Sequence, residues 1–386
     1  MNFVFLSPHF PPNYYPFCVH LRSLGANVLG IADIQFDSLN PELQAALTEY
    51  YRVDDMHSYD QLLRAMGYFT HRYGKIDGID SQNEYWLETE ARLRTDFNIR
   101  GLRSSQINAI KQKSRMKKIY QKAGIQVARG RKVHELRDAH SLISETGFPV
   151  VAKPNIGVGA EKTFMITNHT ELEAFFVDKP KVEYFMEEFV QGQINSFDGL
   201  VDHKSKVIFQ TAHAFSSGVM EAVNRDADIY YYSFRRIPPD LEEVGHRTLD
   251  AFKVRGRFFH FEYFRTRDDR LVALEVNMRP PGGLTTDMFN YANDINIYAG
   301  WAALMVDGSA KLPTTRPYHS AYVGRKTTRH YKNSHEAVLD KCGEYLCHHQ
   351  PIEGIFAAAI GNYGYILRSA DLDDVLELAE FIQQVF

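Results

Sequence analysis

The stretch Leu274–Gly283, LEVNMRPPGG, begins like a buried β-strand but carries polar residues in a regular order. Successive side chains of a strand point to opposite faces, so a strand here places Glu275, Asn277 and Arg279 together on one face. The apolar residues between them point to the other face. A carboxylate, an amide and a guanidinium in one row, followed by Pro-Pro-Gly-Gly, require a structural or chemical reason.

The segment FFHFEYF at residues 258–264 alternates in the same way and predicts the other arm of a β-hairpin. The polar sequence RDDR lies between the arms as the turn. If this turn is symmetric about the midpoint of its two aspartates, Glu262 lies directly opposite Glu275. His260 then lies opposite Asn277.

Like charges directly opposed on neighbouring strands destabilise a sheet by a few tenths to about 1 kcal/mol, and by more when they are partly buried. A shared proton or a divalent cation between the two carboxylates relieves this repulsion. Asn277 adds a neutral oxygen, and an all-oxygen set suits Mg²⁺, which commonly also binds substrate phosphates. Arg279 can hold a phosphate or carboxylate through two hydrogen bonds. The alternative is a shifted register with both glutamates on a solvated face; we expect the metal and phosphate site.

A second candidate phosphate site follows the apolar strand PVVAKP. The loop NIGVGAEK contains Gly157 and Gly159, which allow backbone N–H groups to approach phosphate oxygens closely. The loop is neither a P-loop nor a GxGxxG motif, and a plain surface turn is the alternative. Lys153, inside the strand, is costly to bury unless an anion meets it.

The composition excludes several classes of protein. The chain has 386 residues, 44% of them apolar and 24% charged, with a formal net charge of −4, so we expect no nucleic-acid partner. The apolar stretch at residues 298–306 is too short to span a bilayer, and we expect no membrane association. The three cysteines form no pairable framework, which favours a reduced, cytoplasmic protein.

The pattern of elements predicts an α/β fold that becomes α+β in its catalytic part. Strands alternate with helices up to about residue 110, which is typical of a parallel sheet. A basic helix is expected at residues 107–124, followed by antiparallel strands, a helix at residues 238–254, and the hairpin. In the tail, YVGRK and IFAAAIG are expected as strands before a final helix. We therefore divide the chain into residues 1–110, 111–310 and 311–386.

The region from Lys111 to Gly283 resembles the ATP-grasp superfamily, of the carboxylate–amine ligase type. The matching features are the ordered set of Lys113 ten residues before AGI, PVVAKP with its glycine loop, MEEFV, FHFEYF and LEVNMRP. The superfamily includes L-amino acid ligases, D-alanine–D-alanine ligase and biotin carboxylase. The resemblance implies an ATP-grasp fold with an N-terminal α/β pre-grasp domain at residues 1–110. It also implies a glycine loop and lid at about residues 125–190, and a C-terminal segment that completes the catalytic domain.

The resemblance implies a role for individual residues. Those implied to bind ATP are Lys113, Lys153, Gly157, Gly159, Glu187, Glu188, Phe189, Val190 and Asp198. The lysines would contact the phosphates, Glu187 would take the adenine amino group, and the backbone that follows it would meet the ring edge. Glu262, Glu275 and Asn277 would hold Mg²⁺, usually as two ions, with Mn²⁺ as a substitute. Arg279 and Lys153 would serve catalysis.

The chain departs from the family pattern at the ribose contact. Many members carry a glutamate two residues after the hinge glycine, but here Gly192 is followed by Gln193 and Ile194. Asp198 lies on the same face of the predicted strand as Ile194, and we expect it to substitute.

The resemblance implies an ATP-dependent carboxylate–amine ligase that forms an amide or peptide bond through an acyl phosphate. One alternative is a bicarbonate-activating enzyme like biotin carboxylase or carbamoyl phosphate synthetase, and another is a non-catalytic nucleotide-binding regulator. We expect a small carboxylate and an amine as substrates, and the family's frequent pairing suggests a homodimer. The segment Ser216–Asp226 and the pair Arg235-Arg236 are expected to line or cover the substrate pocket, although a surface role is the simpler reading of Arg225, Arg235 and Arg236.

Overall fold

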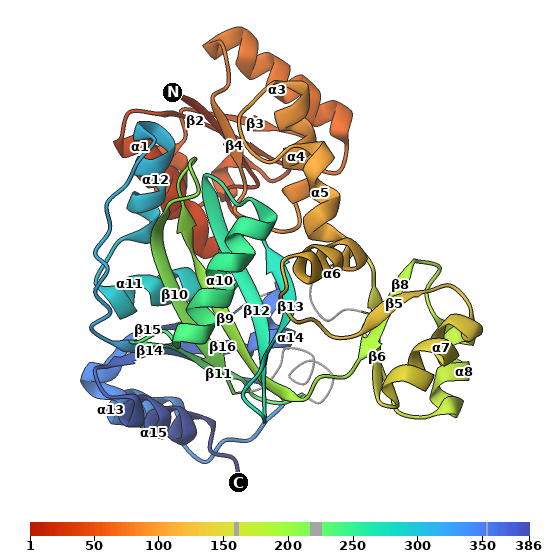
Figure 1. The fold of residues 1–386 in the computed structure, drawn as a ribbon. Coiled ribbons are helices and arrows are strands. Elements are labelled where there is room, and N and C mark those ends of the chain that lie inside the picture. Colours follow the sequence, from red (N-terminus) through yellow and green to blue (C-terminus); the bar gives the residue numbers. More distant parts are fainter. Residues whose placement is uncertain (158–161, 217–225, 353) are drawn as a thin grey trace.

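The computed structural model describes residues 1–157, 162–216, 226–352 and 354–386 (Figure 1). Its strands form three sheets. The N-terminal sheet lies at the top of Figure 1, the largest sheet lies in the centre, and a small lobe projects to the right. In the described ranges, no helix is both long and apolar enough to cross a bilayer.

The N-terminal sheet is parallel, in the order β3-β2-β1-β4. Its strands are β1 (Asn2–Leu6), β2 (Asn27–Ala32), β3 (Glu49–Arg52) and β4 (Gly78–Asp80). Helices α1 (Tyr15–Ser23) and α3 (Tyr59–Tyr73) cover its two faces, with α2 (Pro41–Ala46) and α4 (Leu87–Asp96) beside them. Phe3 packs against Trp301 on one face, whereas Val4 packs with Met66 and Phe69 on the other. The predicted parallel α/β arrangement is confirmed.

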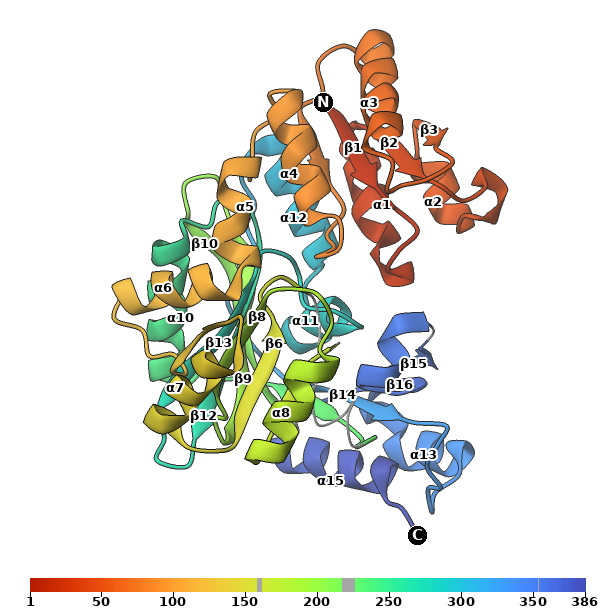
Figure 2. The ribbon, with the colours of Figure 1, turned by 90° about the vertical axis from the view of Figure 1, so that its right-hand side faces the viewer.

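The central sheet has eight strands, and every neighbouring pair is antiparallel, in the order β13-β12-β9-β10-β11-β14-β16-β15. The strands are β9 (Gly192–Val201), β10 (Val207–Phe215), β11 (Tyr230–Ser233), β12 (Arg257–Thr266), β13 (Leu271–Asn277), β14 (His319–Arg325), β15 (Leu346–Pro351) and β16 (Tyr363–Ser369). The tail of the chain thus continues the sheet that contains the predicted hairpin. Helices α13 (His335–Cys342) and α15 (Leu372–Gln383) cover this end (Figure 2).

The two faces of the central sheet are packed differently. On one face, Phe197, Phe259 and Phe261 pack against α6 (Lys113–Lys122) and α10 (Pro239–Phe252). On the other face, Leu200 and Phe258 join the cluster that contains α11 (Thr285–Asn293) and α12 (Ile297–Asp307). The second face is apolar only in part, because polar residues occupy the next rows along the same strands.

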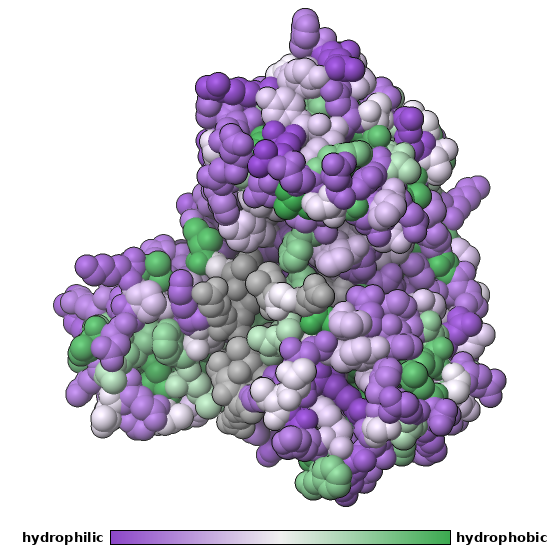
Figure 3. Space-filling view, turned by 180° about the vertical axis from the view of Figure 1, so that it is seen from behind, coloured by the Kyte–Doolittle hydropathy of each residue, from purple (hydrophilic) through white to green (hydrophobic). Residues whose placement is uncertain are grey.

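The small lobe is an antiparallel sheet with two helices on it. Its strands, in the order β5-β8-β6-β7, are β5 (Gly130–Val133), β6 (Val150–Pro154), β7 (Phe164–Ile166) and β8 (Tyr184–Glu188). Helices α7 (Leu136–Thr146) and α8 (His169–Asp178) complete its separate core. The space-filling view shows this lobe standing out from the body of the protein (Figure 3).

Two expectations about secondary structure are wrong. The basic segment is not one helix, because Gln112 adopts an extended conformation (φ −89°, ψ 110°) between α5 (Ser104–Lys111) and α6. The segment IFAAAIG is not a strand: Gly354–Phe356 is a 3-10 turn and Ala357–Ile360 is the short helix α14. Its alanines favour a helix, and the strand lies further on, at β16.

Candidate active site

The register of the hairpin is as predicted, although its turn is not. Glu262 pairs with Glu275 and His260 with Asn277 across β12 and β13. Tyr263, however, pairs with Ala273, so Leu274 is an extra residue, a β-bulge. The turn is offset from the predicted midpoint, and the bulge compensates for this offset. Without the bulge the paired faces would slip by one residue, and Glu275 would no longer face Glu262.

The opposed glutamates belong to two polar rows that cross four strands of the sheet. The first row is Glu275, Glu262, Ser196 and His213, and the second is Asn277, His260, Asp198 and Thr211. Directly paired residues share a face, so all eight side chains point to the same side. This side is opposite the apolar face that packs on α6 and α10, and it forms the polar floor of the candidate site.

Asp198 is fully buried at the centre of this floor. Ser196 Oγ donates to its Oδ2 at 2.6 Å, His213 Nδ1 donates to the same oxygen at 2.7 Å, and His260 Nδ1 donates to Oδ1 at 2.5 Å. Burial acts to raise the pKa of Asp198, but the His260 charge and these hydrogen bonds lower it to about 2. Both oxygens accept hydrogen bonds from the protein, so Asp198 holds the two histidines in place, and its expected ribose contact stays a prediction.

His260 connects Asp198 to the hairpin. Its Nε2 lies 3.5 Å from Glu262 Oε1, on the side of the ring away from Asp198. Burial acts to lower the pKa of His260, but the charges and hydrogen bonds of Asp198 and Glu262 raise it to about 9. The imidazole is therefore protonated at neutral pH and orients Glu262. The sequence analysis missed this role, although His260 and Asp198 alternate in phase with the glutamates.

The break at Gln112 places Lys113 at the start of α6, where the end of β6 caps the helix. Asn155 accepts the N–H of Lys113 with its backbone oxygen at 2.8 Å and the N–H of Ser114 with Oδ1 at 2.9 Å. These bonds satisfy two of the N–H groups that a helix start leaves unpaired. They also bring Lys113 and the end of the strand that carries Lys153 to the same place.

Glu187, on β8, is held between two lysines. Its Oε1 pairs with Lys153 Nζ, and its Oε2 lies 3.0 Å from Lys117 Nζ. Glu187 and Lys117 are each only 4% exposed. Burial acts to raise the pKa of Glu187, but the charges of the two lysines lower it to about 2. The expectation that the Glu187 carboxylate takes the adenine amino group did not anticipate this engagement of both oxygens.

Lys117 was not predicted, although its spacing gave a signal. It follows Lys113 by four residues, which places both side chains on one face of α6. Its Nζ also donates to the backbone oxygen of Ala273 at 3.2 Å. Helix α6 therefore joins the small lobe to the hairpin through Lys117.

Lys113 lies between the hairpin and the glycine loop. Its Nζ is 3.4 Å from Glu275 Oε1 and donates to the backbone oxygen of Gly157 at 3.3 Å. Burial acts to raise the pKa of Glu275, but the charges of Lys113 and Lys153 outweigh burial and lower it. Gly159, the other predicted loop glycine, lies outside the described residues.

Arg279 faces a glutamate from the N-terminal part of the chain. Its Nε lies 3.7 Å from Glu84 Oε2, and its Nη1 donates to the backbone oxygen of Pro280 at 2.8 Å. Glu84 follows strand β4, and burial raises its pKa. The sequence around residue 84 does not predict this contact, because the two residues lie about 200 positions apart in the chain.

Strand β8, which carries Glu187, ends at Glu188, and the backbone groups of residues 188–190 follow as a candidate contact edge for a ligand. Glu188 N–H donates to Arg129 O at 2.9 Å, and Phe189 N–H donates to Pro149 O at 3.1 Å. The Glu188 carboxylate is held by Arg129, at 2.7 Å from Nη2. The N–H of Val190 has no hydrogen-bond partner among the residues that the structure describes. This edge is the predicted adenine contact, which stays a prediction.

The expected pocket cover is only partly described. Residues 217–225, including Arg225, lie outside the described residues. Arg235 and Arg236 are exposed, and Arg235 Nη1 donates to Ala370 O at 2.6 Å. Arg235 therefore joins the tail of the chain, which agrees with a surface role.

The donors at the hairpin fit a hard divalent cation. Glu262 and Glu275 face each other directly, and Asn277, in the next row, is only 7% exposed. The single lysine beside Glu275 is shared with a backbone oxygen and does not separate the two carboxylates. In the described part of the chain, no cluster of three or more histidine, cysteine, aspartate or glutamate residues could hold a metal; this set has two carboxylates and one amide.

The chain is similar over part of its length to curated proteins, among them a ligase and a synthase. It is 22% identical over 236 residues to the L-arginine-specific L-amino acid ligase of Bacillus subtilis, which covers 59% of this chain and 57% of the relative. It is 24% identical over 207 residues to the carbamoyl phosphate synthase large chain of Agathobacter rectalis, which covers 50% of this chain and 18% of the relative. The matched regions thus span little more than half of the first relative and under a fifth of the second. No protein-family profile matches the chain.

Solved structures match nearly the whole chain. The L-amino acid ligase from Bacillus licheniformis has a TM-score of 0.74 at 14% identity and covers 98% of this chain and 96% of its own. The biotin carboxylase domain of the Hydrogenobacter thermophilus 2-oxoglutarate carboxylase, in complex with MgADP and bicarbonate, has a TM-score of 0.70 at 15% identity, with coverages of 95% and 86%. At these identities the likeness establishes the fold: the chain has the ATP-grasp fold that the sequence resemblance implied.

Proposed function

We propose that this chain, built on the ATP-grasp fold, is an ATP-dependent carboxylate–amine ligase that forms an amide or peptide bond through an acyl phosphate and releases ADP and phosphate. One observation carries the proposal. Glu275 faces Glu262 across the hairpin, with Lys113 3.4 Å from Glu275 and Arg279 two residues beyond the end of the same strand. This arrangement concentrates the groups that a nucleotide phosphate and its metal ion need.

Lys113 and Lys153 bind the phosphates of ATP in this proposal. Glu187 pairs with Lys153 and holds its ammonium group in place until the phosphates provide a stronger partner. The backbone edge at residues 188–190 meets the adenine ring, with the free N–H of Val190 as its donor. The backbone of Gly157 approaches the phosphates, and residues 158–161 of the predicted glycine loop lie outside the described residues. The adenine contact thus belongs to the backbone, because the Glu187 carboxylate is engaged by lysines.

Glu262, Glu275 and Asn277 hold Mg²⁺ in this proposal, as two ions, with Mn²⁺ as a substitute. When bound there, the metal supplies the positive charge that neutralises the nucleotide phosphates. His260 orients Glu262, and Asp198 keeps His260 protonated. The chain thus provides both the ligands and the supports that fix one of them.

The reaction has two steps, and this chain contributes position and charge to both. A carboxylate oxygen of the acid attacks the γ-phosphorus, the bond to ADP breaks, and an acyl phosphate forms. The amine then attacks the acyl carbon, the C–N bond forms, phosphate leaves, and the nitrogen loses a proton. Lys153 and Arg279 neutralise the charge on the transferred phosphate. No serine or cysteine nucleophile is required.

We also propose a domain organisation for the chain. Residues 1–110 form the pre-grasp domain, which supplies Glu84 beside Arg279. Residues 111–310 form the ATP-grasp domain, with its lid at about 125–190, and residues 311–386 complete its sheet. The second candidate function is activation of bicarbonate, favoured by the fold shared with a biotin carboxylase domain bound to that anion.

A screen of acids against amines tests the proposal. The full chain is incubated with ATP and Mg²⁺, release of ADP is measured, and the coupled product is sought by mass spectrometry. The expected result is ADP release that requires both an acid and an amine and is absent in Glu275→Gln. ADP release that depends on bicarbonate alone supports the second candidate. Binding of ATP with no turnover under any condition contradicts both and leaves a nucleotide-binding regulator.

A further inference from the structure

A large cavity lies between the N-terminal sheet and the central sheet, away from the hairpin. It has a volume of about 710 Å³, and the residues around it come from the connection between α4 and α5, the β9–β10 turn, the α10–β12 connection and α12. The whole of strand β4 lines it, together with Lys75 and Asp77 just before the strand. Glu84, beside Arg279, follows the same strand. Strand β4 therefore leads from the cavity toward the candidate active site.

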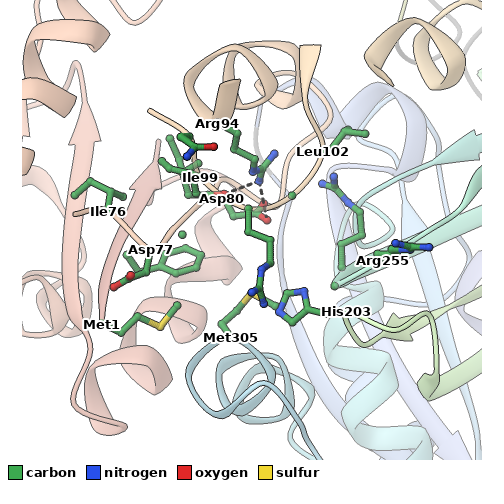
Figure 4. A pocket seen from close by; sticks show the side chains of 18 of the residues that line it. Met1, Ile76, Asp77, Asp80, Arg94, Ile99, Leu102, His203, Arg255 and Met305 are labelled. Atoms are coloured by element: carbon green, nitrogen blue, oxygen red, sulfur yellow. Dashed lines mark hydrogen bonds and ion pairs between the residues drawn. The ribbon is translucent and has the colours of Figure 1, made fainter. Parts of the chain in front are cut away.

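Cationic side chains dominate the described lining of this cavity. They are Lys75, Arg94, Arg100, Arg103, Arg255 and Arg257, and the two carboxylates beside them are Asp77 and Asp80. Figure 4 shows Arg94, His203 and Arg255 reaching it from three different elements. The chain as a whole carries a formal net charge of −4, so this concentration of positive charge is local.

The two carboxylates do not neutralise the most accessible arginines. Asp77 accepts the backbone N–H of Asn2 at 2.8 Å, and Asp80 lies 3.3 Å from buried Arg94. Arg100 and Arg255 are exposed, and neither has an ion pair or hydrogen bond among the described residues. Uncompensated arginines at the mouth of a cavity raise the local concentration of anions.

The backbone around Arg255 is fixed in place. Gly256 adopts a left-handed conformation, with φ +59°, and a Cβ there would collide with the ring of His203. Its N–H donates to Asp202 O at 2.9 Å. The close approach of the two loops thus depends on glycine, and it fixes the backbone next to Arg255, one of the residues that line the cavity. A neighbouring cavity of about 610 Å³ shares Arg100, Arg255 and His203.

Arg257 connects the cavity to the strand of the candidate active site. It is buried, and its Nε donates to Met278 O at 2.9 Å. Met278 directly precedes Arg279. A charge that binds beside Arg257 therefore meets a side chain fixed to the backbone next to Arg279.

We propose that this cavity is a second binding site, for a small polyanion that carries phosphate or carboxylate groups. Its volume is that of a site for a small molecule, and guanidinium groups bind both kinds of anion through paired hydrogen bonds. The site is distinct from the nucleotide site and does not depend on the proposed reaction.

Calorimetric titration of the full chain tests the proposal, with pyrophosphate and citrate as separate probes and EDTA present. The variant of the cavity, called the cleft variant below, is the double substitution Arg100→Glu with Arg255→Glu. Its control is Arg64→Glu with Arg137→Glu, which changes the same charge at exposed helical positions on α3 and α7. We expect the cleft variant to weaken binding at least about tenfold and the control to leave it unchanged. The two probes separate phosphate from carboxylate recognition.

A third variant separates the cavity from the nucleotide site. Lys153→Ala removes a proposed phosphate ligand of ATP, and binding of the preferred probe should persist in it. Loss of all binding in Lys153→Ala, or unchanged binding in the cleft variant, overturns the proposal. Arg100 and Arg255 are exposed, so the fold should survive; Arg100→Ala with Arg255→Ala, checked by thermal melting, gives the same test without charge reversal.

Discussion

Two buried carboxylate sites in this protein differ in how their charge is balanced. In the small lobe, Glu187 is paired with Lys117 and Lys153, so the chain itself compensates its charge. At the hairpin, Glu275 faces Glu262, and the lysine next to it is 3.4 Å away and shared. The first site holds one carboxylate between two lysines, whereas the second leaves two carboxylates directly opposed, each with one cationic neighbour at 3.4 or 3.5 Å. The first site therefore orients the lysines, and the second can accept a divalent cation between its carboxylates.

The largest expected effect is at the opposed glutamates of the hairpin. Glu275→Gln should reduce turnover on the order of 10³-fold or more, because it removes a charged ligand of the metal. The melting temperature without nucleotide should stay the same or rise, since one of two opposed charges is lost. Steady-state ADP release and thermal melting measure the two effects. Glu243→Gln, at an exposed position on α10, is the matched control, and near-normal turnover in Glu275→Gln would refute the metal assignment.

At Glu187 and its two lysines, the main effect of a substitution should be on the stability of the fold. Lys117→Met leaves Glu187 buried with one partner, which should cost about 3 kcal/mol of unfolding free energy. Chemical denaturation measures the loss, and Lys118→Met, the exposed neighbour on α6, should change little. The double variant Lys117→Met with Glu187→Met should recover part of the loss. Equal stability of Lys117→Met and wild type would show that the buried pair does not support the fold.

Lys153 pairs with Glu187 and is also proposed to bind a phosphate of ATP. Its substitution should therefore separate the effect on ATP binding from the effect on stability. Lys153→Ala should weaken ATP binding by about ten- to a hundredfold, because a charged contact to a phosphate is lost. The melting temperature without nucleotide should fall by less than in Lys117→Met, since Lys153 lies nearer the surface. Titration with ATP and thermal melting decide the question. A large loss of stability with unchanged ATP affinity would return Lys153 to a structural role.

The smallest expected effect is the pH dependence of stability. The pKa of Glu187 is about 2 in the fold and 4.5 without it, so its contribution is present above pH 4.5 and is lost as the pH falls toward 2. Between pH 4.5 and 3 this loss amounts to about 2 kcal/mol. The pKa of His260 is raised from 6.5 to about 9, so its contribution is full below pH 6.5 and lost as the pH rises through 9.

Denaturation curves at several pH values check both arms. Glu187→Gln should flatten the acid arm and leave the alkaline arm in place. His260→Gln should flatten the alkaline arm, and it should also change the acid arm because Asp198 loses the neighbouring charge that lowers its pKa. An acid arm as steep in Glu187→Gln as in wild type would show that other carboxylates control acid stability.

The sequence predicted those parts of the site that depend on local alternation. The pairing of Glu262 with Glu275 followed from two strands and a turn, although the bulge at Leu274 was needed to make it correct. The ordered motifs were sufficient for the ATP-grasp fold. The expected helix through Gln112 was wrong because its end is set by a distant cap, Asn155.

Contacts between distant segments were beyond the sequence alone. Glu84 reaches Arg279 from another sheet, and no periodicity joins them. Asp198 was assigned to ribose because its environment was unknown; the three donors around it cannot be read from the sequence. Lys117 lies in a basic run whose sequence is typical of a solvent-exposed helix face. Its burial and its ion pair with Glu187 on β8 distinguish it from the other lysines of that run, and neither can be read from the sequence.

The central claim is that the opposed glutamates hold a metal ion together with a nucleotide. Calorimetric titration of the wild-type chain with ATP, once with Mg²⁺ and once with EDTA, tests it most directly. Binding should be at least about tenfold tighter with Mg²⁺, because the ion offsets the charge of Glu262 and Glu275 against the phosphates. Equal affinity in both titrations, or no heat of binding in either, would contradict the account.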